Sequence, residues 1–218
     1  MMNDKHYSKP LDIQKCTVAM LKCNNPNVEK DCLYSIINNT EYPYDLIVRD
    51  NWIERKHVTV QWNELVKQSH NDYVCLINSD CIVTSGWLKG MMEVITASDK
   101  IAAVGPSTDN CRGPQSQEQR SGIVDFEEYG ERVQMCGFCF VLSKKVWLRL
   151  NGFDEDFRLY GNETEFFYRA RQAGYRTLWV SDIFVKHLGC QTISKFGFYD
   201  VESERNYGRQ KYKELRDK

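Results

Sequence analysis

Hydrophobic and polar residues follow two kinds of pattern along the chain. Short, continuous apolar runs such as residues 73–77 are typical of strands buried inside a parallel sheet. Between these runs, apolar residues recur every three or four positions, which predicts amphipathic helices. The predicted strands cover residues 17–21, 44–48, 73–77, 101–104, 138–142, 178–180 and 184–185, and the predicted helices cover residues 26–39, 61–68, 87–95, 144–150, 163–173 and 202–218.

Residues that favour caps and turns set the ends of these elements. Pro26 fits the first turn of a helix, and Ser85 can cap the helix that follows it. Gly105 and Pro106 close the strand before them, and Gly174 ends a helix. Strands and helices that alternate at this spacing predict an α/β sandwich with a largely parallel sheet.

One polar segment interrupts this rhythm. Residues 107–122, STDNCRGPQSQEQRSG, have almost no apolar side chain to bury, so we expect a mobile loop. Long polar loops in compact domains are often lids or acceptor-binding segments, although a solvated insertion fits the sequence as well.

Composition limits the class of protein. A chain of 218 residues fits one domain, and a net charge of -1 argues against a broadly basic surface for nucleic acid. No apolar run approaches the roughly 18 residues that a membrane span needs, and the polar start lacks the core of a secretory signal. We therefore expect a cytoplasmic protein without stable membrane insertion.

The chain has nine cysteines, an odd number, and several of them lie within apolar patterns. Reduced and mostly buried thiols are the favoured interpretation. Cys136 and Cys139 have CxxC spacing, but no second pair completes a zinc site. Structural thiols are therefore preferred here to metal or redox chemistry.

A carboxylate follows the apolar run of residues 73–77, in the triplet Asn78-Ser79-Asp80. Ligands of open α/β sheets collect at the carboxyl ends of the strands. An ionised carboxylate is costly to desolvate there unless a cation or hydrogen-bond donors meet it. Asp80 could bind Mg²⁺ or Mn²⁺ on a diphosphate, or it could simply cap a turn.

The second half of the chain carries an ordered series of short motifs. It reads MCGFCFVLSKKVWLRLNGFDEDFRLYGNETEFFYRARQAGYRTLWVSDIFVKHLG over residues 135–189. This stretch closely resembles the acceptor half of family 2 glycosyltransferases of the GT-A type. The first half resembles the same family in its strands, in Asn24, Asp50 and Asn63, and in the acid triplet. The resemblance spans roughly residues 16–190.

The resemblance implies a fold and a division of the chain. The fold would be a GT-A type, Rossmann-like three-layer sandwich with a mainly parallel central sheet. Residues 1–15 would be an N-terminal extension and residues 191–218 a C-terminal helical tail. Residues 16–190 would form a single catalytic domain, with a nucleotide-sugar-binding half over 16–106 and an acceptor-binding half over 107–190.

By the same resemblance, Asp80 is a metal ligand and His187 completes the metal shell, with Mn²⁺ or Mg²⁺ as the cation. A late histidine after an apolar strand would otherwise be read as structural. Asn78 stands where the family usually has an acid, and an amide can still hydrogen-bond the ribose or a metal-bound water. Ser79 belongs to the same donor-binding triplet.

The family's catalytic base matches Glu163, at the start of a predicted helix. Direct inverting transfer needs one carboxylate to take the proton of the acceptor hydroxyl. Acids are favoured in first helical turns in any case, and Glu165 could serve the same purpose. Glu163 is preferred, while Glu165 and Gly137 are expected at the acceptor.

The nucleotide half of the resemblance implies further contacts. Asp50 matches the family acid that hydrogen-bonds the base, which suits the N3–H donor of uracil. Cys23 and Asn24 would flank that base. Asn63 would lie near the sugar nucleotide, although a helix cap or a surface amide is the plainer interpretation.

Taken together, these features predict a metal-dependent, inverting hexosyltransferase that uses a nucleotide sugar, with a UDP-sugar favoured. The alternatives are a degenerate GT-A protein that binds a nucleotide or glycan without transfer and, less favoured, a nucleotidyltransferase. The acceptor could be a glycan, a lipid-linked glycan, a protein or a modified DNA base. The basic residues of the tail from Arg205 to Lys218 could touch phosphates, but interspersed acids favour a solvated helix.

Overall fold

The computed structural model describes residues 13–189 and 200–217. Most of the expected N-terminal extension, Cys190 and the first part of the expected tail lie outside the described residues. The elements follow one another in the order β1 (Cys16–Lys22), α1 (Pro26–Asn39), β2 (Tyr44–Asp50), α2 (Asn51–Glu54), α3 (Val58–Gln68), β3 (Tyr73–Asn78), β4 (Cys81–Val83), α4 (Trp87–Ile95), β5 (Ile101–Ser107), α5 (Pro114–Gln117), β6 (Ile123–Asp125), η1 (Phe126–Tyr129), β7 (Cys139–Ser143), α6 (Lys144–Arg149), α7 (Asn162–Gln172), β8 (Arg176–His187) and α9 (Val201–Arg216).

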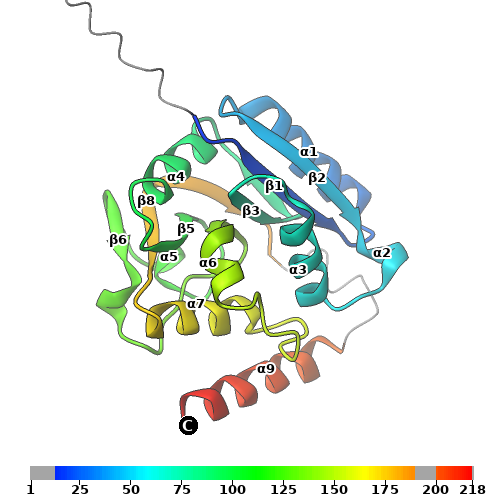
Figure 1. Cartoon of the computed structure of the whole chain (residues 1–218). Helices are drawn as coiled ribbons and strands as arrows, with labels where there is room; N and C mark the ends of the chain where they lie inside the picture. Colours follow the sequence, from blue (N-terminus) through cyan, green and yellow to red (C-terminus); the bar gives the residue numbers. More distant parts are fainter. Residues whose placement is uncertain (1–12, 190–199, 218) are drawn as a thin grey trace, which may run out of the picture.

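One twisted sheet forms the centre of the molecule, with the strand order β2-β1-β3-β7-β5-β8-β4 and with β6 paired to β8 (Figure 1). Strand β1 runs parallel to both β2 and β3, and β5 runs parallel to the first part of β8. Strand β7 is antiparallel to both of its neighbours. Strands β2, β1, β3, β5 and β8 therefore run in one direction, while β7 in the middle of the sheet and the short strands β4 and β6 run in the other.

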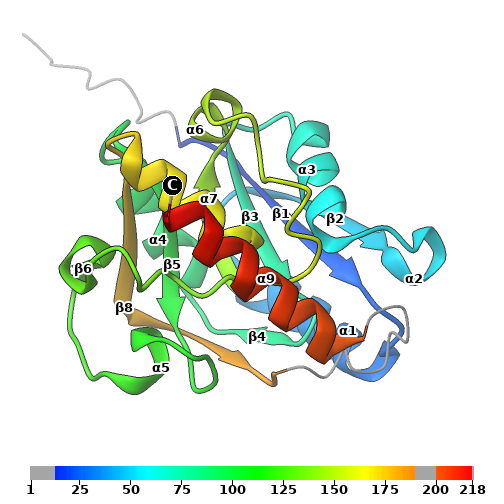
Figure 2. The same ribbon diagram turned by 90° about the horizontal axis from the view of Figure 1, so that it is seen from below.

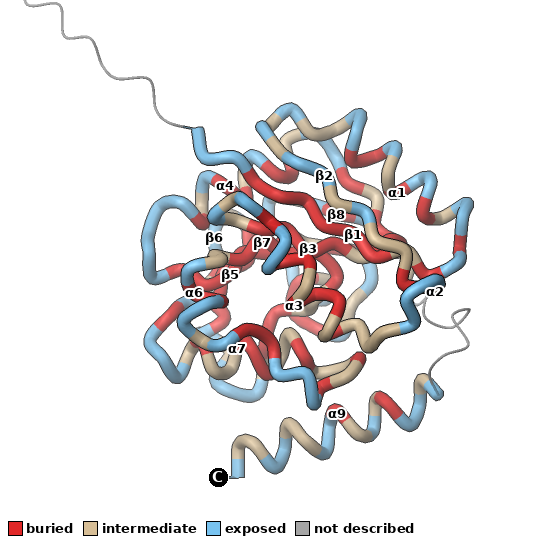
Figure 3. The backbone as a smooth tube through the Cα atoms, turned by 45° about the vertical axis from the view of Figure 1, so that its right-hand side comes forward, coloured by how far each residue is buried: buried red, intermediate tan, exposed pale blue. Residues whose placement is uncertain are grey.

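Side chains of alternate residues along the strands enter two different cores. Met20 and Ile77 face one side of the sheet, where they meet the apolar faces of α1 and α4. Leu21 and Leu76 face the other side, where they meet α3, α6 and α7. This period of two makes the central strands β1, β3, β5 and β7 buried on both faces, as their continuous apolar runs predict, whereas the edge strand β2 has no buried residue. The three-layer sandwich is confirmed, and Figure 3 shows the buried strands between half-exposed helices.

The two short strands expected over residues 178–180 and 184–185 are wrong, because one continuous strand, β8, covers both. The polar residues Ser181 and Asp182 lie between the two expected strands. Ser181 N donates to Gly122 O at 2.9 Å, and the Asp182 carboxylate accepts from Gly122 N at 2.8 Å. Because these groups are satisfied at the edge of the sheet, the strand continues to His187.

The strand expected over residues 101–104 also continues further than predicted, through Gly105 and Pro106 to Ser107. Proline has no backbone N–H to donate to a neighbouring strand. Strand β7 pairs with β5 only at Ala103 and Val104, so Pro106 has no ladder to break on that side.

Helix α4 confirms the apolar face predicted for it, but not its cap. Gly86, at a φ of 76°, is the N-cap, and no side chain caps the helix. The Ser85 hydroxyl donates to the Glu41 carboxylate at 2.7 Å instead. A tight left-handed turn thus replaces the expected side-chain cap.

The polar segment of residues 107–122 contains more order than its composition predicts. It carries the short helix α5, and Thr108, Pro114 and Gln115 are buried. The Gln115 amide donates to Pro106 O and accepts from Cys136 N, both at 2.7 Å. A buried amide with both ends hydrogen-bonded therefore anchors a loop that has little apolar surface.

The eight described cysteines are all free, and six of them are buried. The CxxC residues do not face each other. Cys139 lies in β7 and hydrogen-bonds toward Cys75, whereas Cys136 hydrogen-bonds toward Cys111. Within the described residues, no helix has the length and apolar character required to cross a bilayer.

The expected C-terminal helix is confirmed as α9, and it lies along α7 at one end of the molecule (Figures 1 and 2). Its contact runs through Gly208, which is buried against the backbone of Tyr160. Arg158 pairs with Glu204 at 2.9 Å, and the Arg158 guanidinium lies 4.2 Å from the ring centroid of Tyr207. The helix thus covers the segment that leads into α7.

Gly208→Ala tests this docking. A Cβ at Gly208 would lie 2.2 Å from Tyr160 O, so the helix must move away. An exposed helical glycine replaced by alanine normally gains up to about 1 kcal/mol. Here we expect a loss of about 1–3 kcal/mol in the free energy of unfolding, measured by urea denaturation. Arg209→Ala, at the exposed neighbouring position, should change it by less than about 0.5 kcal/mol. Stabilisation by Gly208→Ala would contradict the contact.

Candidate active site

Three parallel strands end together at one edge of the sheet. Lys22 at the end of β1 is in register with Asp50 at the end of β2. On the other side of β1, Leu21 is in register with Asn78 at the end of β3. The topology therefore brings the predicted residues Cys23, Asn24, Asp50, Asn78, Ser79 and Asp80 to the same edge, as expected for an open α/β sheet.

Asp50 begins this edge. One carboxylate oxygen accepts from Trp52 N at 3.1 Å, which caps α2, and the other lies 3.3 Å from Lys22 Nζ. Nearby, Cys23 N and Asn25 N both donate to the buried Glu29 carboxylate, at 2.6 and 3.0 Å. Burial, followed by the negative charges of Glu29, Asp50 and Asp80, raises the pKa of Cys23 to about 12. Cys23 is therefore a neutral thiol near several carboxylates.

Asn24 and Asn63 differ in what surrounds them. Asn24 is exposed at a φ of 63°, in the turn between β1 and α1. Asn63 is buried in α3, where its amide accepts from Phe153 N and donates to Phe153 O, both at 2.9 Å. It also donates to Glu155 at 2.9 Å. These bonds give Asn63 a structural task, while its expected contact with a sugar nucleotide stays a prediction.

Asp80 and His187 meet at the carboxyl end of β3. Asp80 is only 2% exposed, and its Oδ1 lies 3.4 Å from His187 Nε2. The antiparallel pairing of β4 with β8 sets Cys81 opposite His187 and so fixes this approach. Burial favours the neutral imidazole, but the hydrogen bond and charge of Asp80 outweigh burial and raise the pKa of His187.

Three neighbours orient the imidazole of His187. Its Nδ1 hydrogen-bonds Asn110 O at 2.7 Å, and its backbone N–H donates to the Asp109 carboxylate at 3.0 Å. Phe138 stacks on the ring, with centroids 5.2 Å apart and an interplanar angle of 19°. A ring that donates from Nδ1 to a carbonyl presents Nε2 as a ligand atom.

These side chains fit a divalent cation. Asp80, Cys81 and His187 form a possible metal-binding group, with one ligand atom from each within 4.8 Å of the others. Carboxylate and imidazole suit Mn²⁺. The Cys81 thiol donates to Phe138 O at 3.4 Å, and burial followed by the charge of Asp80 raises its pKa well above the ordinary value. Because Cys81 is a protonated hydrogen-bond donor, Asp80 and His187 are the ligands that the geometry favours.

Glu163 lies in the first turn of α7, close to Gly137. A Cβ at Gly137 would lie 2.6 Å from Glu163 Cγ, so only glycine admits this approach. Burial raises the pKa of Glu163, and the backbone N–H groups of Glu163, Gly137 and Thr164 oppose that shift. The result is a carboxyl group that is more basic than an ordinary glutamate.

Glu165 is buried two residues further along α7 and pairs with Arg169, whose Nη2 lies 2.7 Å from Glu165 Oε2. The same guanidinium donates to Gly152 O at 2.8 Å. These bonds tie α7 to the loop after α6. The expected contacts of Glu165 and Gly137 with an acceptor stay predictions, and the contacts seen here are structural for Glu165.

Several residues of the site gave no signal in the sequence. Glu29, Asp109 and Asn110 act through backbone groups or through hydrogen bonds across the chain. Phe138 reads as an ordinary strand residue, yet its ring covers His187 and its carbonyl accepts from Asn78 N and Cys81 Sγ. Only tertiary contacts reveal these roles.

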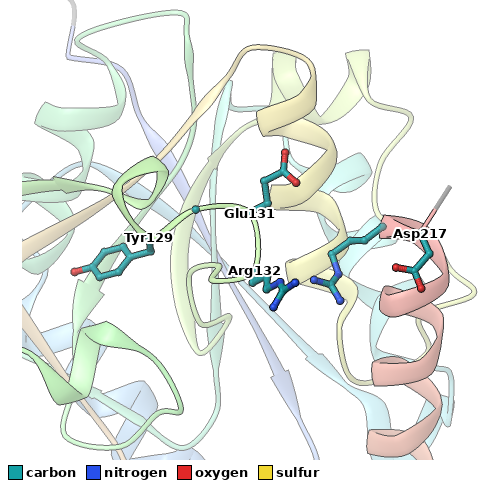
Figure 4. A pocket seen from close by; sticks show the side chains of 6 residues that line it. Tyr129, Glu131, Arg132 and Asp217 are labelled. Atoms are coloured by element: carbon teal, nitrogen blue, oxygen red, sulfur yellow. The ribbon is translucent and has the colours of Figure 1, made fainter.

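A separate open pocket of about 520 Å³ lies between η1 and the end of α9 (Figure 4). It is lined by Tyr129, Gly130, Glu131, Arg132, Arg216 and Asp217, none of which was a predicted site residue. Its arginines are offset by acids of the opposite charge. The strand-end residues predicted to bind the donor and the metal lie elsewhere, at the carboxyl edge of the sheet.

The mainly parallel sheet, with acids at its carboxyl edge and a histidine on the last strand, has the arrangement of the GT-A fold. Residues 53–182 match the sequence model of glycosyl transferase family 2, and the chain belongs to that family. Comparison with curated proteins finds no match.

Solved structures confirm the fold. GalNAc-T7 with UDP, GalNAc and Mn²⁺ superposes with a TM-score of 0.67 at 13% identity, covering 81% of this chain and 44% of that chain. The mannosyltransferase PcManGT from Pyrobaculum calidifontis, in complex with GDP-Man and Mn²⁺, gives a TM-score of 0.60 at 16% identity, covering 87% of this chain and 62% of that chain. The chain spans less than two thirds of each of these proteins.

Removal of either candidate ligand should weaken Mn²⁺ binding. Because loss of an outer-shell partner alone costs about 10- to 100-fold in metal affinity, Asp80→Asn and His187→Ala should each lower it by more than about tenfold. The measurement is calorimetric titration with Mn²⁺ in the presence of UDP. Cys81→Ser keeps the donor to Phe138 O and should leave the affinity unchanged. Equal loss in Cys81→Ser would instead make the thiol a ligand.

Proposed function

We propose that the chain is a cation-dependent, inverting glycosyltransferase that moves a sugar from a nucleotide sugar to an acceptor hydroxyl. Family membership supports glycosyl transfer as the reaction. One observation supports the mechanism most directly: the segment of residues 137–138 touches both the candidate base and the candidate metal ligand. Gly137 lies against Glu163, and Phe138 stacks on His187.

On this proposal, Asp80 and His187 would hold Mn²⁺ or Mg²⁺, which would supply positive charge for the diphosphate leaving group of the donor. Asn78 and Ser79 stand beside Asp80 at the strand end, within reach of a ribose or a phosphate. The Ser79 hydroxyl is buried and makes no hydrogen bond among the described residues, so it has capacity for a ligand. Both solved structures contain Mn²⁺ with a nucleotide or a nucleotide sugar.

Glu163 is the proposed general base. Inverting transfer needs one carboxylate that accepts the proton of the acceptor hydroxyl as the oxygen attacks the anomeric carbon. Burial raises the pKa of Glu163 and so makes its carboxylate a stronger base. The backbone N–H groups around the carboxylate stabilise its ionised form, which a general base needs. Asn162, in the preceding position, uses its side-chain oxygen to accept from Glu163 N at 3.0 Å, which fixes the first turn of α7.

A UDP-sugar is the proposed donor. Asp50 retains a carboxylate at the strand end that could accept a hydrogen bond from N3–H of uracil, with Cys23 and Asn24 beside it. We further propose that residues 16–106 bind the donor and residues 107–190 the acceptor. The hexosyl group and its acceptor, whether a glycan, a lipid-linked glycan, a protein or a modified DNA base, are identified by screening.

Release of the nucleoside diphosphate tests this function. Purified protein with Mn²⁺ should release UDP from at least one of a set of UDP-sugars, and GDP-mannose serves as the comparison donor. Glu163→Gln should lower kcat by about 10²- to 10⁴-fold while UDP affinity is kept, because the base acts on the acceptor rather than on the nucleotide. The anomeric configuration of the product, read by NMR, reports inversion.

Two results would contradict the proposal. Undiminished turnover in Glu163→Gln would remove Glu163 as the base. Binding of UDP without turnover of any donor, against a panel of all four acceptor classes, would favour a protein that binds nucleotides or glycans without transfer.

The pH dependence of the reaction follows from the environment of Glu163. Burial raises the pKa of Glu163 above the ordinary value for glutamate, about 4.3. A general base must be ionised, so kcat/KM should be high above this raised pKa and fall about tenfold per pH unit below it. The profile is measured by UDP release, with circular dichroism to confirm folding at each pH. An acid limb at or below pH of about 4.3 would contradict the burial of this carboxyl group.

A further inference from the structure

Two thiols from distant parts of the chain meet beside the candidate active site. A Cβ placed on Gly113 would lie 3.0 Å from Cys136 Sγ and 3.9 Å from Cys111 Sγ, so both sulfurs border the same small volume. The absence of a side chain at Gly113 leaves that volume open. Cys136 hydrogen-bonds Cys111 across it.

The two thiols differ from the other six described cysteines. Cys111 and Cys136 are partly exposed, whereas the others are buried. The hydrogen bond from Cys136 lowers the pKa of Cys111 to about 6 against the effect of burial, with further help from Ser116 and Gly113. The same contact raises the pKa of Cys136. This asymmetry in pKa favours ionisation of Cys111 before Cys136, and the thiolate is the form of cysteine that reacts with an oxidant.

Metal binding is a weaker use of this pair. The one group of His, Cys, Asp and Glu side chains with metal-ligand spacing among residues 13–189 and 200–217 is Asp80, Cys81 and His187, and it includes neither thiol. Two sulfur ligands alone do not complete a closed thiolate site.

The pair also joins the two halves of the candidate site. Cys111 follows Asn110, whose carbonyl bonds His187 Nδ1 at 2.7 Å. Cys136 precedes Gly137, which lies against Glu163. In the structure, one hydrogen bond already joins the two segments: the side chain of Gln115, four residues after Cys111, accepts from Cys136 N at 2.7 Å. A covalent bond between the sulfurs would therefore link the segment that orients the candidate metal ligand to the segment that contacts the candidate base.

We propose that Cys111 and Cys136 form a redox modification site, at which a hydroperoxide oxidises the two thiols to a disulfide. The Cys111 thiolate attacks one oxygen of the peroxide and breaks the O–O bond, which leaves a sulfenic acid on Cys111 and, when hydrogen peroxide is the oxidant, releases hydroxide that takes a proton from solvent to become water. The Cys136 thiol then displaces the hydroxyl of the sulfenic acid, which releases a second water and forms the S–S bond. Two electrons pass from the sulfurs to the peroxide, and a dithiol reductant reverses the reaction by thiol exchange.

Oxidation should also change the reaction, a consequence that rests on the proposed function. Bond formation draws Cys111 away from Ser116 Oγ and Gly113 O, which lie 3.4 and 3.7 Å from its sulfur. Asn110 moves with Cys111 and disturbs the orientation of His187. We expect at least a tenfold weaker affinity for Mn²⁺ in the presence of UDP, comparable with loss of an outer-shell partner, about 10- to 100-fold. Reduction should restore it.

The experiment treats the full chain with hydrogen peroxide, alkylates the remaining free thiols and maps the cysteines by mass spectrometry. Cleavage after Arg112 and Lys144 gives peptides 101–112, with Cys111, and 133–144, with Cys136 and Cys139. The expected product is a cross-link between these two peptides that lacks two hydrogens, and fragmentation places the bond at Cys136. Cys111→Ser and Cys136→Ser should each abolish the cross-link, while Cys139→Ala should keep it.

Each outcome decides one point. A cross-link through Cys139, a Cys111 that stops at sulfenic or sulfinic acid, or thiols that all stay reduced would overturn the modification site. A correct cross-link with unchanged Mn²⁺ affinity would overturn its effect on His187. If the cross-link forms and no donor is turned over in either redox state, the proposed function fails while the disulfide site stands.

Discussion

The burial of one carboxylate constrains this whole edge of the molecule. Asp80 is 2% exposed, and a charge in that position is unstable without a close counter-charge or strong donors. Strand β4 begins at the next residue and pairs with the end of β8, which returns His187 to within 3.4 Å of that carboxylate. The sheet therefore brings together, across more than a hundred residues of sequence, the two groups that a divalent cation would need. The remaining features of the site, from the stacked ring of Phe138 to the carbonyl of Asn110, keep the imidazole in that place.

Much of the fold could be predicted because burial on both faces of a strand leaves a plain signal. The runs around Met20, Ile77 and Val141 mark strands, and the spacing of Leu88, Met91 and Met92 marks a helix face. The errors arose where polar groups are satisfied by tertiary bonds. Ser181 and Asp182 look like a break in a strand, but Gly122 meets both. Gln115 looks like solvent-exposed loop, but both ends of its amide are bonded in the interior.

The site could be predicted in its outline and less well in its details. Strand ends such as Asp50 and Asp80 must share an edge when the strands are parallel, so their proximity follows from the pattern of the chain. The hydrogen-bond partners of Asn63 and Glu165 could not be predicted from the sequence, because each side chain could reach either a ligand or a neighbouring loop. In the structure Asn63 bonds Phe153, and Glu165 bonds Arg169. The meeting of Cys111 with Cys136 is similarly invisible in sequence, because no pattern predicted the short elements α5, β6 and η1 that lie between them.

Strand β8 carries its histidine in an unusual manner. Its first part runs parallel to β5 and its last part antiparallel to β4, and the pairing with β5 resumes at Ser107 and Phe184 after a register shift between Pro106 and Ser107. The backbone of His187 is thus held by ladders at both ends of a twelve-residue strand rather than by a flexible loop. Such a residue has little conformational entropy left to lose when a cation arrives. Selectivity between cations would then depend on how well the preferred coordination geometry of each ion matches ligands at fixed positions. Movement of the ligands to suit the ion would contribute little.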